Sequence, residues 1–274
     1  MLIQATIGCP HNRCAFCAMY KDKPFRIRPV SEIQEDIRSA KEYYGDDVDT
    51  MFFPDGNTII MRTEQLEEIF SYACEIFPRL ERITLYGSAR FMNMKTPDEL
   101  ARLKKAGLTR IHSGMESGDD VTLTLIDKGA DATALIEAGR KVHSAGIELS
   151  EYIMIGVGGR ERTREHAAES ARVLNAIEPD FIRLRTFMPM QGTALYTKWR
   201  QGDFGLLRPH EALTETARLI EGLETPSMLY SDHPSNYAYV NGHIPEDKQA
   251  MLAVIAKLIT LPETSFRPPE TGSL

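Results

Sequence analysis

The sequence lacks the features of several protein classes. It has only four cysteines in 274 residues, which argues against a disulfide framework and favours metal binding or catalysis. No apolar run reaches the roughly 20 residues that span a membrane. The first residues, MLIQATIGCP, do not show the basic segment and long apolar segment of a signal peptide. We therefore expect a cytoplasmic protein with no membrane contact.

Positive charge is also scarce. Lysine and arginine number 32 against 39 acidic residues, which gives a formal net charge of -7. Proteins that bind nucleic acid or anionic membranes typically carry an excess of basic residues. We expect a small-molecule substrate and no nucleic-acid partner. The length is typical of a single α/β barrel and is sufficient for a full apolar core.

Short apolar segments alternate with longer amphipathic ones. Strand-like segments lie at 2–8, 49–56, 82–89, 109–117, 147–156 and 180–189. Helix-like segments lie at 31–45, 63–78, 96–107, 131–146 and 163–177. Repeated βα units predict a parallel sheet with helices outside it, joined by right-handed crossovers. The predicted fold class is α/β, with six units in sequence that form a TIM-like barrel, either closed or partly open.

The remaining residues, 201–274, depart from this rhythm. They contain helix-like runs near 209–223 and 245–260, with the loop 224–248 between them. We predict a C-terminal extension of helices and loops that caps the barrel.

The predicted strands carry unusual polar side chains. Because alternate residues face opposite sides of a strand, Ile182 and Leu184 should face the helices while Arg183 and Arg185 point inward. The same rule directs these polar residues inward: Tyr86, Ser88, His112, Glu116 and Tyr152, with Arg90 just beyond its strand. A purely structural barrel is filled with Val, Ile and Leu. Either an internal network of ion pairs or a polar cavity for a charged ligand explains the pattern, and we favour the cavity.

Three cysteines lie within nine residues, in the string IGCPHNRCAFCAMYK. Cys9, Cys14 and Cys17 have the spacing C-x4-C-x2-C and follow the first predicted strand, at the end of a barrel where active sites lie. A [4Fe–4S] cluster with three thiolates has one iron without a protein ligand, which a cofactor or substrate can bind. The fourth cysteine, Cys74, lies within a helix-like segment, and we expect it to be a small buried residue.

This motif resembles that of the radical S-adenosylmethionine (SAM) superfamily. Its members usually carry C-x3-C-x2-C after the first strand of a partial (β/α)6 barrel, with an aromatic residue before the last cysteine, as Phe16 is here. The first gap is one residue longer in this chain, while the strings FPDGNT and GMESGDD are similar to those of a stand-alone group within the superfamily. The resemblance covers roughly residues 1–200 and implies an oxygen-labile [4Fe–4S] cluster, and hence anaerobic chemistry. It also implies SAM on the open iron and an electron donor such as flavodoxin or ferredoxin.

The implied reaction is reductive cleavage of SAM to a 5′-deoxyadenosyl radical that abstracts hydrogen from a substrate. The resemblance assigns Cys9, Cys14 and Cys17 to the cluster. The implied SAM contacts are Asp55, Gly56, Ser88, Glu116, Gly156 and Arg185. The pair Asp55 and Gly56 replaces the G-G-E motif of many members, and Arg185 would meet the SAM carboxylate.

The other inward residues suggest the substrate. Arg90, His112, Tyr152 and Arg183 are cationic or hydrogen-bonding, and we expect them to form the catalytic and substrate-binding set. Arginine binds carboxylate and phosphate groups in a two-pronged geometry. The sequence therefore predicts a small anionic substrate.

Two other interpretations use the same cysteines. A non-enzymatic iron–sulfur or zinc-binding protein could take its fourth ligand from His11 or a partner. A thiol redox protein could use Cys14 and Cys17, but this leaves Cys9 unexplained. The absence of a second cysteine cluster argues against sulfur insertion and leaves isomerisation, dehydrogenation, elimination or adenosyl addition.

Overall fold

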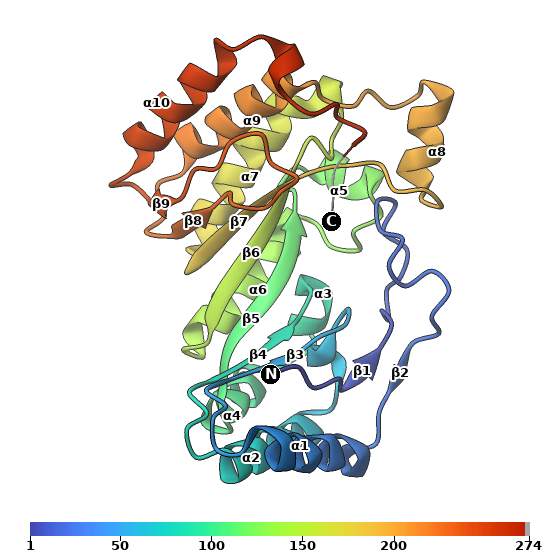
Figure 1. The fold of residues 1–274 in the computed structure, drawn as a ribbon, viewed down its shortest axis with the longest axis vertical. Helices are drawn as coiled ribbons and strands as arrows, with labels where there is room; N and C mark the ends of the chain where they lie inside the picture. The colour runs from blue at the N-terminus through green and yellow to red at the C-terminus, as the bar shows by residue number, and fades with distance from the viewer. Residues whose placement is uncertain (272–274) are drawn as a thin grey trace. The chain divides into compact units, whose positions relative to one another are not determined.

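The computed structural model describes residues 1–271, and its central element is a seven-stranded, mostly parallel sheet (Figure 1). The strands follow the order β3 (Thr50–Phe53), β4 (Arg82–Tyr86), β5 (Leu108–Glu116), β6 (Glu148–Ile155), β7 (Phe181–Thr186), β8 (Met228–Tyr230) and β9 (Gly242–His243). The pairs β3–β4, β4–β5, β6–β7 and β7–β8 are parallel, and β8–β9 is antiparallel. This is the α/β fold that the sequence predicts.

The first predicted strand differs from the structure. Most of segment 2–8 lies outside the sheet, and β1 (Thr6–Ile7) pairs with β2 (Arg26–Ile27) in a separate antiparallel ribbon. Leu2 nevertheless forms a parallel bridge with Phe52 of β3, where the N–H of Ile3 donates to the Phe52 carbonyl at 3.0 Å. The start of the chain therefore runs beside β3 and then leaves the sheet before the cysteines.

Helices follow most of the strands. The α-helices are α1 (Val30–Tyr44), α2 (Thr63–Ile76), α3 (Ala89–Met92), α4 (Pro97–Lys105), α5 (Asp120–Leu125), α6 (Ala132–Ser144), α7 (Thr163–Ile177), α8 (Ala194–Gln201), α9 (Pro209–Gly222) and α10 (Lys248–Ile259). Short 3-10 helices are η1 (Thr58–Ile60), η2 (Arg160–Arg162) and η3 (Glu263–Ser265). Within residues 1–271, no helix has both the length and the apolar character needed to cross a bilayer.

Local sequence explains these elements. In α2, Leu66, Ile69 and Phe70 recur at the three- and four-residue spacing of one helix face, and all three are buried. In α4, Thr96 and Glu99 form a capping box that satisfies two backbone N–H groups at the helix start. Along β7, buried and half-buried residues alternate in the predicted order. The periodicity that predicted the helices and strands is thus the one that the core uses.

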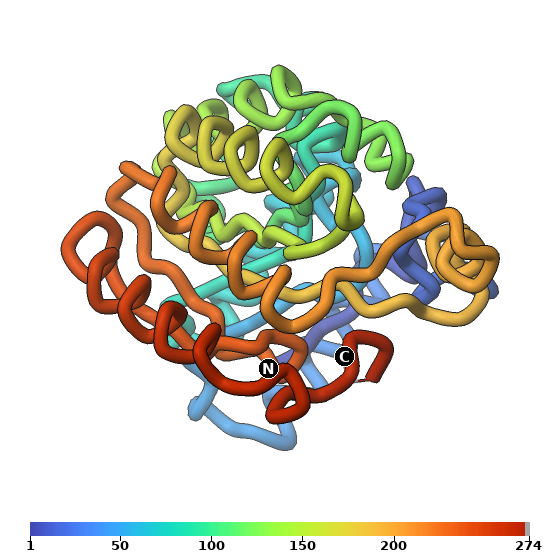
Figure 2. The backbone as a smooth tube through the Cα atoms, turned by 90° about the horizontal axis from the view of Figure 1, so that it is seen from above, coloured from blue at the N-terminus to red at the C-terminus, as the bar shows by residue number. Residues whose placement is uncertain are grey.

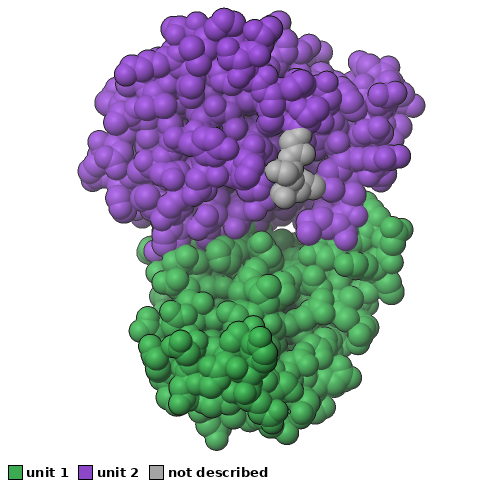
Figure 3. All heavy atoms as spheres, in the orientation of Figure 1, with its two compact units in different colours: residues 1–12, 20–113, 137–149 green, residues 13–19, 114–136, 150–274 purple. Residues whose placement is uncertain are grey.

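Two compact units divide the chain (Figure 3). Unit 1 comprises residues 1–12, 20–113 and 137–149, and unit 2 comprises residues 13–19, 114–136 and 150–274. In unit 2, helix α9 packs against both α7 and α10 (Figures 1 and 2).

The predicted extension 201–274 supplies β8 and β9 as well as helices, and β8 continues the parallel pairing of β7. The last predicted residues, 272–274, lie outside the described part of the chain. The boundary between residues 200 and 201 stays a prediction.

Candidate active site

Cys9 lies in unit 1, in a cradle formed by the turn after β3. Its Sγ is 3.5 Å from the backbone nitrogen of Asn12 and 3.7 Å from Nδ2 of Asn57, and both nitrogens are donors. A methyl group on Gly56 would lie 2.6 Å from Cys9 Cβ, so the turn has room only for glycine there. The turn after β3 therefore holds the Cys9 sulfur, the predicted iron ligand, in one place.

The residues around Cys9 are fixed by their own hydrogen bonds. The Asp55 carboxylate accepts from Gln4 Nε2 at 2.7 Å and from the Gly8 N–H at 3.3 Å. Asn57 Oδ1 accepts from the N–H of Ser88 at 2.6 Å, which joins the ends of β3 and β4. Asp55, Gly56 and Ser88 thus share one site in unit 1. Asp55 has a positioning role that the sequence did not predict, and its contact with SAM stays a prediction.

Cys14 and Cys17 lie in unit 2. The N–H of Cys17 is 3.3 Å from the Cys14 carbonyl, and the intervening Ala15 donates to the Ile126 carbonyl at 2.8 Å. Phe16 packs on an apolar cluster that contains Ala15 and Ile126. The aromatic residue before the last cysteine therefore anchors this half of the cysteine loop.

Glu116 ends β5 with a positive φ of 66° and pairs with Lys128, which was not predicted from the sequence. Lys128 Nζ is 3.3 Å from Glu116 Oε1, and both side chains are almost fully buried. Burial lowers the pKa of Lys128, but the charge of Glu116, followed by Cys14, outweighs it and raises the pKa above its usual value. A Cβ at Gly114 would lie 2.3 Å from Glu116 Oε1, so this glycine makes room for the pair. The ammonium group also lies 5.9 Å from the Phe16 ring centroid, beside the cysteine loop.

A second buried pair lies next to Glu116. His166 of α7 and Glu215 of α9 are 0% and 1% exposed, and their Nδ1 and Oε1 atoms are 3.0 Å apart. Glu215 Oε1 also accepts from the Gly156 N–H at 2.7 Å, and His166 Nε2 is 3.2 Å from the Glu116 carbonyl oxygen. Burial lowers the pKa of His166, but the charge of Glu215 and the hydrogen bond to it raise the pKa overall. The pair thus ties α7 and α9 to two predicted SAM-binding positions.

The arginines of β7 lie among aromatic and neutral groups. Arg185 Nη1 is 3.2 Å from Nε2 of His233, and its guanidinium carbon is 5.2 Å from the centroid of Tyr152. The Arg183 guanidinium is 4.8 Å from the centroid of Tyr230. Arg183, Arg185 and Tyr152 thus gather in unit 2, together with His233 from the predicted capping loop.

The other two predicted catalytic residues lie in unit 1. His112 packs edge-on against Phe52 and Tyr86, with ring centroids 5.7 and 5.9 Å away. Arg90 lies in α3, where it is exposed and stands over the Phe91 ring. The two residues belong to the same unit, and their roles stay predictions.

Cys74 differs from its prediction. It lies in α2, as expected, but is exposed and not buried, because it stands at the edge of the apolar face, four residues after Phe70. Its sulfur is 3.9 Å from the Ala106 carbonyl oxygen. Cys74 lies in unit 1, separate from the Cys9 cradle.

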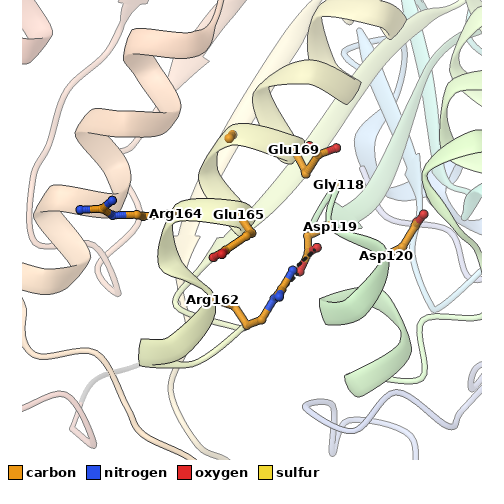
Figure 4. Close-up of a pocket in the computed structure, with 8 residues that line it drawn as sticks. Gly118, Asp119, Asp120, Arg162, Arg164, Glu165 and Glu169 are labelled. Atoms are coloured by element: carbon orange, nitrogen blue, oxygen red, sulfur yellow. Dashed lines mark hydrogen bonds and ion pairs between the residues drawn. The ribbon is translucent and has the colours of Figure 1, made fainter.

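A pocket of about 500 Å³ lies in unit 2 at the start of α7 (Figure 4). It is lined by Gly118, Asp119, Asp120, Arg162, Arg164, Glu165, Ala168 and Glu169. Arg162 closes a two-pronged ion pair with Asp119 at 2.7 and 3.0 Å, and Asp119 also accepts from the N–H of Thr122 at the start of α5. The pocket contains no predicted site residue, and its charged groups hold two helix ends together.

The three cysteines are the kind of ligand that a three-thiolate cluster requires. Cys9, Cys14 and Cys17 are free thiols, each half-buried. Cys9 has the Gly56 cradle and two N–H donors, and Cys14 has the ammonium of Lys128 among its charged neighbours. Within residues 1–271, no three His, Cys, Asp or Glu side chains stand together as a metal site. The assignment of the three cysteines as ligands therefore stays a prediction that their chemistry supports.

Three contributors to the site were not predicted from the sequence: Lys128, the His166–Glu215 pair and His233 as the neighbour of Arg185. A weak signal existed for His166, since it lies on the apolar face of α7 with Ala167 and Ala171. A buried histidine on such a face requires a partner, but the sequence does not identify it.

Comparison with known proteins identifies a family. The model of the radical SAM superfamily matches residues 3–174. A Methanocaldococcus jannaschii protein described as uncharacterized is 22% identical over 79% of this chain and 69% of its own length. The biotin synthase of Carboxydothermus hydrogenoformans is 25% identical over 68% of this chain and 56% of its own length.

Solved structures share the fold. Methylornithine synthase has a TM-score of 0.57 at 19% identity, with 81% of this chain and 62% of that chain covered. Coproporphyrinogen III oxidase from Escherichia coli, described as a radical SAM enzyme, has a TM-score of 0.56 at 15% identity, with 80% and 51% covered. This chain spans less than two thirds of the length of either structure, and the similarity concerns the fold.

Proposed function

The chain belongs to the radical SAM superfamily, and on that premise we propose that it uses SAM to act on a small anionic substrate. Members of this superfamily bind a [4Fe–4S] cluster and SAM, so the protein is a radical SAM enzyme. The observation that supports the anionic substrate is the pair of β7 arginines, which lie beside tyrosines and a histidine.

The cluster would be held by Cys9, Cys14 and Cys17. When bound, it supplies the electron that cleaves SAM to a 5′-deoxyadenosyl radical. The chain itself supplies the cradle around Cys9, and Phe16 fixes the other two cysteines. These contacts orient the three thiolates before the cluster is loaded.

SAM would be held by the residues predicted for it. We propose Asp55, Gly56, Ser88, Glu116 and Gly156 as its contacts, and we add Lys128 because it lies 3.3 Å from Glu116. A buried carboxylate and ammonium match the amino and carboxylate groups of SAM, and burial strengthens such contacts. That Arg185 also binds SAM stays a prediction.

The substrate would meet the remaining predicted residues, Arg90, His112, Tyr152 and Arg183. Their role is to bind and orient an anionic molecule beside the SAM ribose and to keep water away.

Radical SAM enzymes need a reductant, and we propose an acidic carrier such as flavodoxin or ferredoxin. The loop between the last cysteine and α1 exposes Lys21, Lys23 and Arg26. These positive charges suit an acidic partner.

The ligand assignment can be tested with single cysteine variants. Cys9→Ala, Cys14→Ala and Cys17→Ala should lose most of the iron, about four atoms per chain after anaerobic reconstitution, because three thiolates hold the cluster. Iron analysis and 5′-deoxyadenosine formation measure the result. Cys74→Ala is the matched control and should retain both. If Cys74→Ala loses iron as completely as Cys14→Ala, the ligand assignment is wrong.

The same preparations test the enzymatic role. The reduced wild-type cluster should change its EPR spectrum when SAM is added, because SAM binds the open iron. If SAM leaves the spectrum unchanged, the alternative of a non-enzymatic iron–sulfur or zinc protein is favoured.

A further inference from the structure

Two arginines on one face of β7 lack a carboxylate partner among residues 1–271. Arg183 and Arg185 are two residues apart, so both project from the same side of the strand. The arginines that pair with carboxylates elsewhere in the chain include Arg28, Arg102, Arg110, Arg160 and Arg162. The β7 pair instead contacts two tyrosine rings and one imidazole. Two half-buried cations without an anion attract a negatively charged ligand.

Tyrosines on the neighbouring strands hold the two guanidinium groups. Tyr152 of β6, Arg183 of β7 and Tyr230 of β8 are in register across three parallel strands. Arg183 stands 4.8 Å from the Tyr230 centroid, and Arg185 stands 5.2 Å from that of Tyr152. A guanidinium group held over a ring keeps its N–H edge free for a carboxylate or phosphate. Arg183 Nε is buried and has no hydrogen-bond partner in the described residues, so one donor of this edge is unsatisfied.

His233 adds a neutral group beside Arg185. Burial and then the charge of Arg185 lower the pKa of His233, so the neutral ring can accept from Arg185 Nη1 at 3.2 Å. Its segment is attached to the end of β7, where Ser235 Oγ accepts from the Thr186 N–H at 3.0 Å. Asn236 Nδ2 donates to the Leu184 carbonyl at 2.8 Å. Two hydrogen bonds from the residues that follow His233 to the β7 backbone therefore hold its segment beside Arg185.

We propose that Arg183, Arg185 and His233 form the subsite that holds the anionic group of the substrate, a carboxylate or a phosphate. The inference rests on the proposed function and deepens it by assigning the anion to named residues. It assigns Arg185 to the substrate, because Lys128 is the cation that pairs with Glu116. It also gives segment 231–236 a role, since this part of the C-terminal region completes the subsite.

The subsite can be measured without turnover. Inorganic phosphate and succinate are titrated separately, by calorimetry, into the cluster-loaded full-length protein, with sodium chloride keeping the ionic strength constant. Loss of one charged hydrogen bond weakens binding about ten- to a hundred-fold, so Arg183→Met and Arg185→Met should each weaken anion binding by that factor. His233→Asn should weaken it less, because a neutral partner is lost. Arg200→Met is the matched control, since Arg200 also stands over a ring, that of Trp199, but is exposed.

Weaker anion binding in Arg183→Met and Arg185→Met, with unchanged SAM affinity, supports the subsite. The anion that the wild type binds more tightly identifies the chemical group. If the wild-type protein binds phosphate and succinate no more tightly than the Arg183→Met variant, the proposed subsite is wrong. An Arg185→Met variant that loses SAM affinity but keeps anion binding also overturns it and assigns Arg185 to SAM. The formation of 5′-deoxyadenosine by the wild type is a separate readout, so failure of the proposed function is distinguishable from failure of the subsite.

Discussion

At the scale of single residues, Gly56 determines whether the Cys9 thiol has room in its turn. Its hydrogen atom faces Cys9 where a methyl group would stand 2.6 Å from Cβ and 2.9 Å from Sγ. Contacts this short force the cysteine or the turn to move, because the backbone holds both groups and neither side chain can rotate away. The structural reason for glycine at this position is therefore space, not backbone conformation.

Gly56→Ala should displace Cys9 and lower iron loading to the level of Cys9→Ala. The overpacked turn should also reduce the free energy of unfolding by about 1–3 kcal/mol. Iron content per chain and the thermal midpoint of the unloaded protein measure the two effects. Gly205→Ala is the control, because its new methyl group would meet the flexible Arg160 side chain at an ordinary 3.4 Å. A Gly56→Ala protein that loads iron like Gly205→Ala would show that the cradle is not needed.

Glu116→Gln should weaken SAM binding by about ten- to a hundred-fold, since one charged hydrogen bond is worth about 1.5–3 kcal/mol. Iron content should not change, because Glu116 is not a predicted ligand. Calorimetric titration of SAM into the loaded protein measures the affinity. Glu148→Gln removes the carboxylate of a more exposed pair with Arg110 and should leave the affinity unaltered. Equal affinities in both variants would make Glu116 and Lys128 a structural ion pair only.

At the scale of elements, helices α7 and α9 are joined by more than apolar packing. Their buried His166–Glu215 pair also holds Gly156 at the end of β6 and lies against the Glu116 carbonyl. Two charges buried together are costly to separate, since removal of one leaves the other without compensation. The helices therefore fix the strand ends that we propose for SAM.

The pair makes stability depend on pH. The pKa of folded His166 is raised above its usual 6.5, so its contribution is fully present below the unfolded pKa and is lost as the pH rises through the folded pKa. Glu215→Gln should lower the free energy of unfolding by about 3–5 kcal/mol in acid, near pH 6, and by less in alkaline solution. Urea denaturation of the unloaded protein across this range gives the profile. Glu221→Gln, an exposed change on the same helix, should change the free energy of unfolding equally at every pH. If the effect of Glu215→Gln is equally independent of pH, His166 and Glu215 are not a charged pair.

At the scale of the whole molecule, the C-terminal region is part of the sheet. Strand β8 pairs in parallel with β7, and α9 buries Leu213, Leu219 and Ile220 in its packing with other helices. Each such side chain contributes about 1.5–3 kcal/mol when buried, and a whole domain is stable by only about 5–15 kcal/mol. The region 201–271 is therefore expected to be required for folding of unit 2.

A chain that ends at residue 200 should fail to melt cooperatively and should aggregate, because β7 becomes an unpaired edge. A chain that ends at Thr260 keeps β8, β9 and α10 and serves as the control. Circular dichroism during heating and size-exclusion chromatography measure both. If the chain of residues 1–200 remains monomeric and melts in one sharp transition, the barrel is an autonomous domain and the predicted boundary at residue 200 has a structural meaning.

The sequence by itself determined the features that depend on neighbouring residues. The spacing of Cys9, Cys14 and Cys17 indicated the cluster motif, and the βα rhythm predicted a parallel α/β sheet. Helix α7 occupies the predicted residues 163–177, and β7 alternates between buried and half-buried residues as predicted. These features can be predicted because the periodicity of a helix or strand appears in the order of adjacent side chains.

Only the tertiary structure decided which distant residues meet. Lys128 pairs with Glu116 across 12 residues, Arg185 meets His233 across 48, and Glu215 reaches Gly156 across 59. Local periodicity cannot specify such partners, because chain folding brings them together through the packing of whole elements. The strands β8 and β9 have three and two residues, which is too short for a period-two pattern to appear. Their place beside β7 therefore emerges only when the sheet is assembled.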